Sequence, residues 1–178
     1  LYAIDATPSE IVFVLPNNKN IIMAAEQAVP LSEKRVIVIP TKNIPQGISA
    51  LLAFDPDSEA QANIQAMEGA IAGVRAGQIT YAARNSEFDG KKIKEGEYLA
   101  LCEGKLCANS KKPLDAVKKL AREMVQDDSA FATIIFGEGV SEEDAAKVEE
   151  IFHKENRDLE ITVIDGGQPV YYYIISVE

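Results

Sequence analysis

The chain has 178 residues, enough for one large domain or two small domains with real hydrophobic cores. Its net charge is -10 and its pI is about 4.7, and no run of lysine and arginine offers a surface for a phosphate backbone, which argues against nucleic acid as a partner. The longest apolar runs, 11–15 and 36–39, are too short to span a bilayer and no signal-like leader opens the chain, so we expect a cytoplasmic protein without a membrane span.

The first part of the sequence contains one pattern twice. An apolar run at 11–15 is followed by a proline, a polar loop and a helix-forming stretch at 21–29, and the run at 35–39 leads in the same way to a helix at 48–54. Continuous apolar strands are typical of a sheet that is covered on both faces. The repeated pattern predicts a parallel βαβα unit.

A long helix is predicted next, over residues 60–77. Ser58 is the expected N-cap, because Gln61 follows three residues later as in a capping box, and Gly77 is the expected C-cap. The helix is rich in alanine and glycine, so its axis can lie close to a sheet or to another helix. We place a boundary after it, between a first sub-domain at 1–76 and a second at 77–178.

The second sub-domain is predicted to be a mixed or antiparallel sheet with helices on one face, in the order ββββαβαββ. Its elements are expected as a strand at 78–84, an Asp-Gly turn at 89–90, a hairpin around 103–106, helices at 114–125 and after Ser141, and strands at 130–136, 160–164 and 169–177. Gly166 and Gly167 are expected in a turn, with Pro169 at the start of the last strand. The overall class is therefore α/β, a parallel βα part followed by an α+β part.

Polar side chains, most of them neutral, follow both predicted parallel strands. Asn17, Asn18 and Asn20 follow the first strand, and Thr41, Lys42, Asn43 and Gln46 follow the second. Ligands of open parallel sheets bind beyond the carboxyl ends of the strands, so these side chains predict a recognition rim. No acid, histidine, cysteine or serine occurs in either loop, so we expect no catalytic group and no metal ligand in the rim.

Simpler roles compete with recognition. Asn17 or Asn18 can simply cap the following helix. Arg84, at the end of the strand predicted at 78–84, can clamp a carboxylate or phosphate and completes the candidate rim, or it can form an ion pair with a nearby acid.

The remaining reactive residues have structural interpretations. Cys102 and Cys107 flank the predicted hairpin and can face each other, although two small apolar side chains explain them as well. His153 is expected near the end of a helix, where a cation complements the helix dipole. Residues 86–178 hold 20 acidic and 12 basic side chains, which indicates either solvated helix faces or a docking surface for a basic partner.

The sequence resembles the C-terminal region of the bacterial fatty acid kinase A subunit, a dihydroxyacetone kinase-like family. Four segments carry the resemblance in the family's order over nearly the whole chain: LPNNKNIIMAAEQA, VIPTKNIPQGISALLAFDP, ITYAARNSEFDGKKIKEGEYLAL and GGQPVYYYIISVE. The resemblance implies a DegV-like fold, similar to that of the fatty acid-binding B subunits. It also implies that a glycine- and threonine-rich loop precedes Leu1, so that the first sub-domain, a partial Rossmann-like unit, is truncated here.

The family further implies that separate domains and subunits carry separate functions. An upstream kinase domain binds ATP and magnesium, a middle domain dimerises, and the B subunit presents a fatty acid whose carboxylate is phosphorylated for phospholipid synthesis. We therefore expect this region to have no cofactor of its own and to dock the B subunit against the kinase domain. The alternative is a domain that itself holds a fatty acyl chain, with Asn17, Thr41 or Arg84 at the head group.

Overall fold

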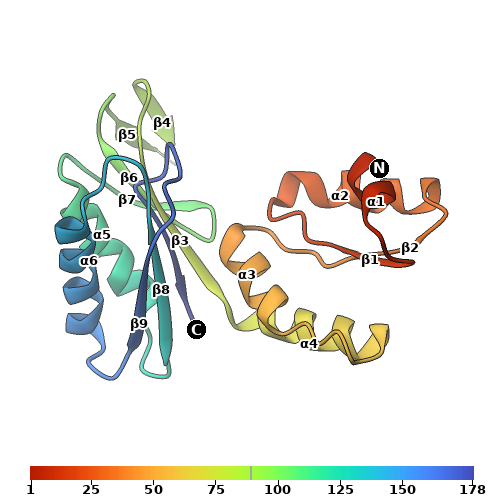
Figure 1. The fold of residues 1–178 in the computed structure, drawn as a ribbon. Helices are drawn as coiled ribbons and strands as arrows, with labels where there is room; N and C mark the ends of the chain where they lie inside the picture. The colour runs from red at the N-terminus through yellow and green to blue at the C-terminus, as the bar shows by residue number, and fades with distance from the viewer. Residues whose placement is uncertain (89) are drawn as a thin grey trace. The chain divides into compact units, whose positions relative to one another are not determined.

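The protein is described here by a computed structural model, which covers residues 1–88 and 90–178 and divides into two compact units (Figure 1). Unit 1 comprises residues 1–74 and unit 2 comprises residues 75–178. The division lies two residues before the boundary expected from the sequence. Each unit has hydrophobic clusters of its own, so each is described separately.

Unit 1 is a two-stranded parallel sheet with four α-helices. Its elements are α1 (Tyr2–Ala6), β1 (Ile11–Val14), α2 (Lys19–Ala28), the 3₁₀ turn η1 (Val29–Leu31), β2 (Arg35–Val38), α3 (Ile44–Leu52) and α4 (Ala60–Gly73). The strands pair in parallel from Ile11 opposite Arg35 to Val14 opposite Val38. The repeated strand, loop and helix pattern is thus confirmed, with α1 as an additional helix.

Both faces of this small sheet are covered, as its continuous apolar strands predict. Side chains alternate along a strand, so Val12 and Val36 pack with Ile4 of α1 on one face. Phe13 and Ile37 point to the other face and join the cluster of Ile39, Ala50 and Met67, which involves α3 and α4. The two strands are therefore held between two separate apolar layers.

The ends of α4 differ from the sequence-based expectation. Ser58 is not its N-cap: the helix starts after Glu59, and the Ser58 hydroxyl donates a hydrogen bond to the Asp55 carboxylate at 2.7 Å. Gly77 is not its C-cap, because the helix ends at Gly73 and Gly77 lies inside the next strand. A side chain at position 77 would collide with Met124 and come within 3.0 Å of Leu120 Cδ2, so close packing explains this glycine.

Unit 2 is a six-stranded mixed sheet with two helices and a small hairpin. Its elements are β3 (Arg75–Tyr81), β4 (Ser86–Phe88), β5 (Lys91–Ile93), β6 (Tyr98–Cys102), β7 (Lys105–Ser110), α5 (Pro113–Met124), β8 (Phe131–Phe136), α6 (Glu142–Glu155), β9 (Glu160–Asp165) and β10 (Tyr173–Val177). The strand order in the main sheet is β7-β6-β3-β10-β8-β9. Only β8 and β9 run parallel there, so the predicted mixed sheet is confirmed. The described residues of unit 2 form eight strands, against seven in the predicted order.

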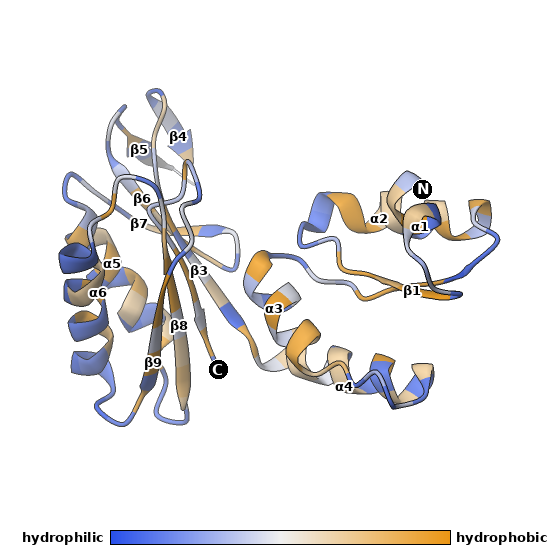
Figure 2. Ribbon diagram, viewed as in Figure 1, coloured by the Kyte–Doolittle hydropathy of each residue, from blue (hydrophilic) through white to orange (hydrophobic). Residues whose placement is uncertain are grey.

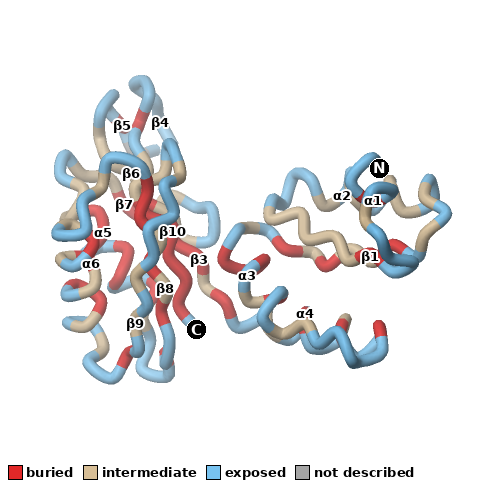
Figure 3. Tube along the Cα trace, viewed as in Figure 1, coloured by how far each residue is buried: buried red, intermediate tan, exposed pale blue. Residues whose placement is uncertain are grey.

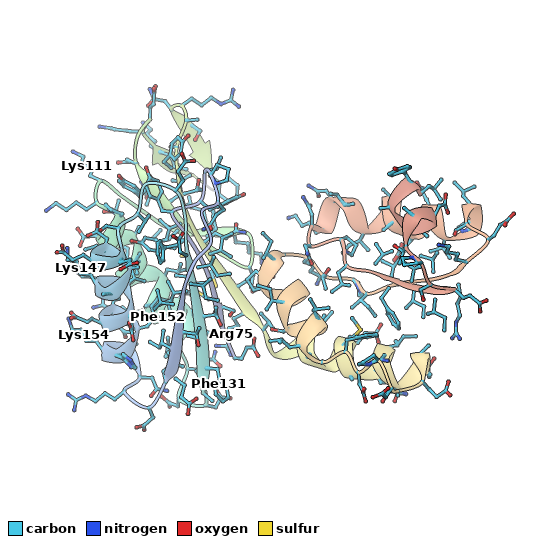
Figure 4. All side chains as sticks on the ribbon, in the orientation of Figure 1. Arg75, Lys111, Phe131, Lys147, Phe152 and Lys154 are labelled. Atoms are coloured by element: carbon cyan, nitrogen blue, oxygen red, sulfur yellow. The ribbon has the colours of Figure 1, made fainter. Side chains whose placement is uncertain are left out.

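The helices α5 and α6 pack against each other and against one face of this sheet (Figure 1). The core between them includes Leu120 and Met124 of α5, Phe152 of α6, and Ile134 and Ile175 of the sheet, all completely buried. Phe152 points from α6 toward the sheet in Figure 4. Every residue of β10 is buried, and Figure 3 shows this strand in red at the centre of the unit.

Two turns shape the sheet. Glu103 and Gly104 have positive φ values of 50° and 73°, and they join β6 to β7 in the tight hairpin that the sequence predicts. The strands β4 and β5 also pair as a hairpin, although Asp89 of the predicted Asp-Gly turn lies outside the described residues.

The last strand starts later than predicted. Pro169 does not begin it, because Val170 has a φ of 72°, which interrupts an extended backbone, and β10 starts only at Tyr173. Gly167 has the positive φ that was expected of the paired glycines.

Candidate functional site

The amide-rich loops lie together at the carboxyl ends of β1 and β2. The backbone N–H of Asn17 donates a hydrogen bond of 3.0 Å to the hydroxyl of Thr41, which is completely buried. This bond joins the loop that follows β1 to the loop that follows β2. We call the unit 1 side chains at this edge the amide rim: Asn17, Asn18, Asn20, Thr41, Lys42, Asn43 and Gln46.

Several amides of the rim are used to start helices. Asn18 is the N-cap of α2, and its side chain accepts a bond of 2.9 Å from the backbone N–H of Asn20. Asn43 caps α3 in the same way, accepting from the backbone N–H of Gln46 at 2.9 Å. Helix capping is therefore the confirmed role of Asn18, as the simpler interpretation predicts.

The sequence predicts Gln46 in a loop, but the structure places it in α3. The helix α3 begins four residues earlier than predicted, with Pro45 in its first turn, so Gln46 belongs to the helix and is buried. Its side-chain carbonyl accepts a bond of 2.8 Å from the backbone N–H of Lys42. The buried Gln46 and Thr41 thus hold the loop in shape, while Asn20 and Lys42 are exposed.

Asn17 is the unusual member of the rim. Its φ is 54°, in the left-handed region that asparagine tolerates better than most residues. Its Oδ1 is buried and accepts no hydrogen bond from any residue that the structure describes. The side chain lies against Gly47, where an added Cβ would be 2.6 Å from Asn17 Cγ. Sequence reasoning missed Gly47, because a glycine inside a helix signals close packing only when its neighbour is known.

Arg84 does not share a unit with the other candidates. It belongs to unit 2, lies three residues after the end of β3 and is exposed. The alternative ion pair is not found either: within the described part of the chain, no acid forms a salt bridge with Arg84. The amide rim as observed consists of unit 1 residues alone.

The helix α3 carries large apolar side chains on its solvent side. Ile44, Ile48, Leu51 and Leu52 are 46%, 40%, 63% and 82% exposed, and their spacing places them on one face of the helix. The buried face holds the smaller or polar Gln46, Gly47 and Ala50. Figure 2 shows the apolar colour of α3. We call these four exposed residues the α3 ridge; it begins beside Asn43, at the amide rim.

The cysteines and the histidine have structural surroundings. Cys102 carries a thiol and forms no disulfide bond with Cys107. The Cys107 thiol donates a hydrogen bond to the carbonyl oxygen of Ala100 at 3.3 Å. Burial, followed by the neighbouring charges of Cys107 and Glu103, raises the pKa of Cys102 to about 11. His153 lies in the last turn of α6, 3.8 Å from the Glu149 carboxylate.

The chemistry available at the rim is hydrogen bonding. Its side chains donate and accept hydrogen bonds, Lys42 adds one positive charge, and none of its members is a nucleophile paired with a base. Among the described residues, no group of three histidine, cysteine, aspartate or glutamate side chains could hold a metal ion. No helix in the same part of the chain is long and apolar enough to cross a membrane.

Comparison with known proteins places this geometry in a family. Residues 1–178 match the FakA-like C-terminal family, which groups the C-terminal regions of fatty acid kinase A subunits and similar proteins. Protein YloV of Bacillus subtilis is 43% identical over 176 residues, which is 99% of this chain and 32% of that protein. The chain therefore spans about a third of the length of this curated relative.

Solved structures show the same fold at low sequence identity. A DegV family protein from Corynebacterium glutamicum has a TM-score of 0.66 at 13% identity, covering 99% of this chain and 76% of that one. The Streptococcus pneumoniae fatty acid kinase B3 protein, loaded with linoleic acid, has a TM-score of 0.65 at 10% identity, covering 99% and 74%. The dihydroxyacetone kinase from C. freundii, in complex with AMP-PNP and Mg²⁺, has a TM-score of 0.64 at 15% identity, covering 99% and 40%.

These likenesses confirm the DegV-like α/β fold and the resemblance drawn from the four sequence segments. The chain belongs to the FakA-like family of fatty acid kinase C-terminal domains.

Proposed function

We propose that this domain is the non-catalytic docking domain of a fatty acid kinase. It binds the fatty acid-loaded B protein of the same system and presents it to the kinase domain of its own polypeptide, which phosphorylates the fatty acid with ATP. The acyl phosphate then serves phospholipid synthesis. The observation that carries the proposal is the α3 ridge, an apolar surface that starts at a rim without reactive side chains.

The ridge supports a protein partner because of its composition. A helix normally turns its large apolar residues inward, and contiguous exposed apolar surface is characteristic of interaction sites. Here Leu51 and Leu52 face solvent while Gly47 and Ala50 face the core. Lys42, which is exposed and lies two residues before Ile44, adds a polar side chain at the start of the ridge, as expected at the edge of an interface.

The residues of this chain do not fit a bound magnesium nucleotide. Within the described residues no carboxylate cluster could hold the metal, and the sequence has neither G-x-G-x-x-G nor G-x-x-x-x-G-K-[ST]. We therefore assign ATP and magnesium to the kinase domain of the longer parent protein, together with its dimerising domain. The 178-residue chain alone is expected to have no kinase activity.

The test is calorimetric titration of the chain with the B protein from the same source, loaded with fatty acid, at moderate salt. Saturable binding supports the proposal, and no heat of binding contradicts it. Replacing Leu51 and Leu52 together by serine should weaken binding at least tenfold, because apolar anchors carry most of the energy of an interface. Leu31→Ser is the matched control, since Leu31 is 69% exposed in η1, at the other end of the parallel strands.

A kinetic experiment distinguishes docking from lipid binding. The added chain should inhibit the full-length kinase by competing for the B protein, and the L51S/L52S variant should inhibit much less. Lipid analysis of the purified chain by mass spectrometry covers the alternative: a stoichiometric fatty acid on the chain, with no effect on the kinase, would overturn the docking role.

A further inference from the structure

Unit 2 contains a cavity of about 510 Å³ that the docking role does not use. Its walls come from the starts of α5 and α6, from β6 and from the beginning of β10, and they are formed by Tyr98, Lys112, Pro113, Leu114, Asp115, Lys118, Gly139, Val140, Asp144, Tyr172 and Tyr173. This volume is within the range of small-molecule sites. The wall combines apolar side chains and tyrosine rings with a few polar groups.

Tyr173 is the polar group that points to a ligand. The residue is 2% exposed, lines the cavity, and its hydroxyl forms no hydrogen bond within the described part of the chain. Burial, followed by the charge of Asp144, raises its pKa to about 12, so the hydroxyl keeps its proton at neutral pH. The hydroxyl is therefore a donor in the cavity wall that no described residue uses, and a bound acceptor could take its hydrogen bond.

The start of α5 adds donors on the same wall. The helix has 12 residues, its N-cap Lys112 gives no side-chain hydrogen bond, and Pro113 occupies its first turn. The backbone N–H groups of Leu114 and Asp115 are therefore without intrahelical partners, as at every helix start, and the positive end of the helix dipole lies here. By contrast, the Ser141 hydroxyl caps α6 by accepting from the N–H of Asp144 at 3.1 Å.

The cavity wall carries two lysines and two aspartates. Asp115 is paired with Lys118 at 3.2 Å, and Lys147 is paired with both Asp144 and Glu143 at 3.0 Å. Figure 4 shows Lys147 on α6. Lys112 forms no salt bridge with any described residue and remains available. Asp115 and Asp144 at the cavity each have a lysine partner, and Lys112 is the cation of the wall that an acidic group of a ligand can pair with.

We propose that this cavity binds a small organic anion, a carboxylate or phosphate on a flat apolar group. Tyr173 and the first N–H groups of α5 hold the acidic group, with Lys112 nearby. The apolar part lies among Leu114, Val140 and the ring of Tyr98. The ring centroids of Tyr98 and Tyr172 are 5.2 Å apart, which gives this wall a fixed aromatic surface.

The experiment is a titration of the ¹⁵N-labelled chain with phenyl phosphate, followed by two-dimensional NMR. We expect saturable shifts of the Leu114 and Asp115 amide signals, and at least tenfold weaker binding for inorganic phosphate, which lacks the apolar part. Benzoate tests whether a carboxylate replaces the phosphate. Absence of saturable shifts with both aromatic probes, or equal affinity for inorganic phosphate, would overturn the proposal.

Two variants test the assigned residues. Tyr173→Phe removes only the hydroxyl and should weaken phenyl phosphate binding at least about tenfold, because the charged group of the ligand loses one hydrogen bond. The matched control is Tyr171→Phe, because Tyr171 does not line this cavity. Leu114→Trp fills the cavity and should abolish the shifts. Unchanged affinity in both Tyr173→Phe and Leu114→Trp would place the ligand elsewhere and refute the site.

Discussion

Asn17 of the amide rim packs directly against Gly47 of α3. The asparagine has a left-handed backbone and a buried oxygen without a partner, and the glycine leaves just enough space for its amide. The sequence predicted that asparagines gather here, because they follow two parallel strands. It could not predict which asparagine would cap a helix and which would pack against another helix. That depends on how close the loop after β1 lies to the loop after β2.

Two glycine-to-alanine substitutions, one at Gly47 and one at Gly69, test the contact between Asn17 and Gly47. Gly47 and Gly69 both lie inside helices, so alanine should stabilise either helix by about 0.5–1 kcal/mol through backbone entropy. At Gly69 the new methyl meets nothing within 4 Å, but at Gly47 it displaces Asn17. We expect Gly69→Ala to raise the free energy of unfolding and Gly47→Ala to lower it by about 1–3 kcal/mol in urea titrations. Equal effects would show that Asn17 moves without cost.

The raised pKa of Cys102 makes its reactivity predictable. The folded-state pKa is about 11, against an ordinary value of 9.0, mainly because of burial. The thiolate is the reactive form, so Cys102 should react with iodoacetamide markedly more slowly than an unfolded control at pH 8. The native state holds this proton more tightly, so its stabilising contribution is complete below pH 9 and is lost as the pH rises toward 11. Mass spectrometry of labelled peptides gives the rate, and alkylation as fast as in urea would contradict the burial.

At the scale of elements, some helix starts were predictable from the sequence and others were not. Ser141 is the N-cap of α6, in agreement with the helix predicted to start after it, whereas the capping box predicted at Ser58 does not start α4. The Ser58 hydroxyl is not available to cap α4, because it donates a hydrogen bond to the Asp55 carboxylate. The same carboxylate accepts a hydrogen bond from the backbone N–H of Asp57. The late prediction for α3 came from reading Pro45 and Gly47 as loop residues. Proline is favoured in the first turn of a helix, where Pro45 lies, and Gly47 is needed for close packing against Asn17.

The cap of α6 can be tested directly. Ser141→Ala removes the acceptor for the Asp144 amide and should lower the free energy of unfolding by about 1 kcal/mol. Ser86→Ala is the control in the same unit, because Ser86 is exposed and its hydroxyl bonds to no described residue. Urea unfolding followed by circular dichroism compares the two variants. A loss as large in Ser86→Ala would rule out the cap as the cause.

For the whole molecule, the two units differ in how much they bury. Unit 1 relies on a sheet of two four-residue strands, and two strands alone are marginal without helices to cover them. Unit 2 holds most of the fully buried large side chains found in the described residues, among them Phe152, Leu120 and Ile175. The fold class was predictable because alternating apolar and polar residues, and continuous apolar runs, identify strands and helices from short stretches of sequence. The strand order was not, because pairing partners far apart in sequence leave no local pattern.

Hydrogen exchange should reveal this difference. Backbone amides of β3, β8 and β10 should exchange at least about tenfold more slowly than those of β1 and β2, because protection follows the buried apolar contacts that must open. Exchange measured by NMR or mass spectrometry on the intact chain tests this expectation. Similar protection in both units would show that they unfold as one body.

The position of β10 also bears on how the protein is made. This strand comes last among the strands of the chain, yet it joins the antiparallel block β7-β6-β3 to the parallel pair β8-β9. While the ribosome is still producing residues before 173, the two blocks have no shared strand, and their facing edges are open to wrong pairing. The sheet can close only in one late step, so translation speed and chaperones should matter more for unit 2 than its final stability indicates.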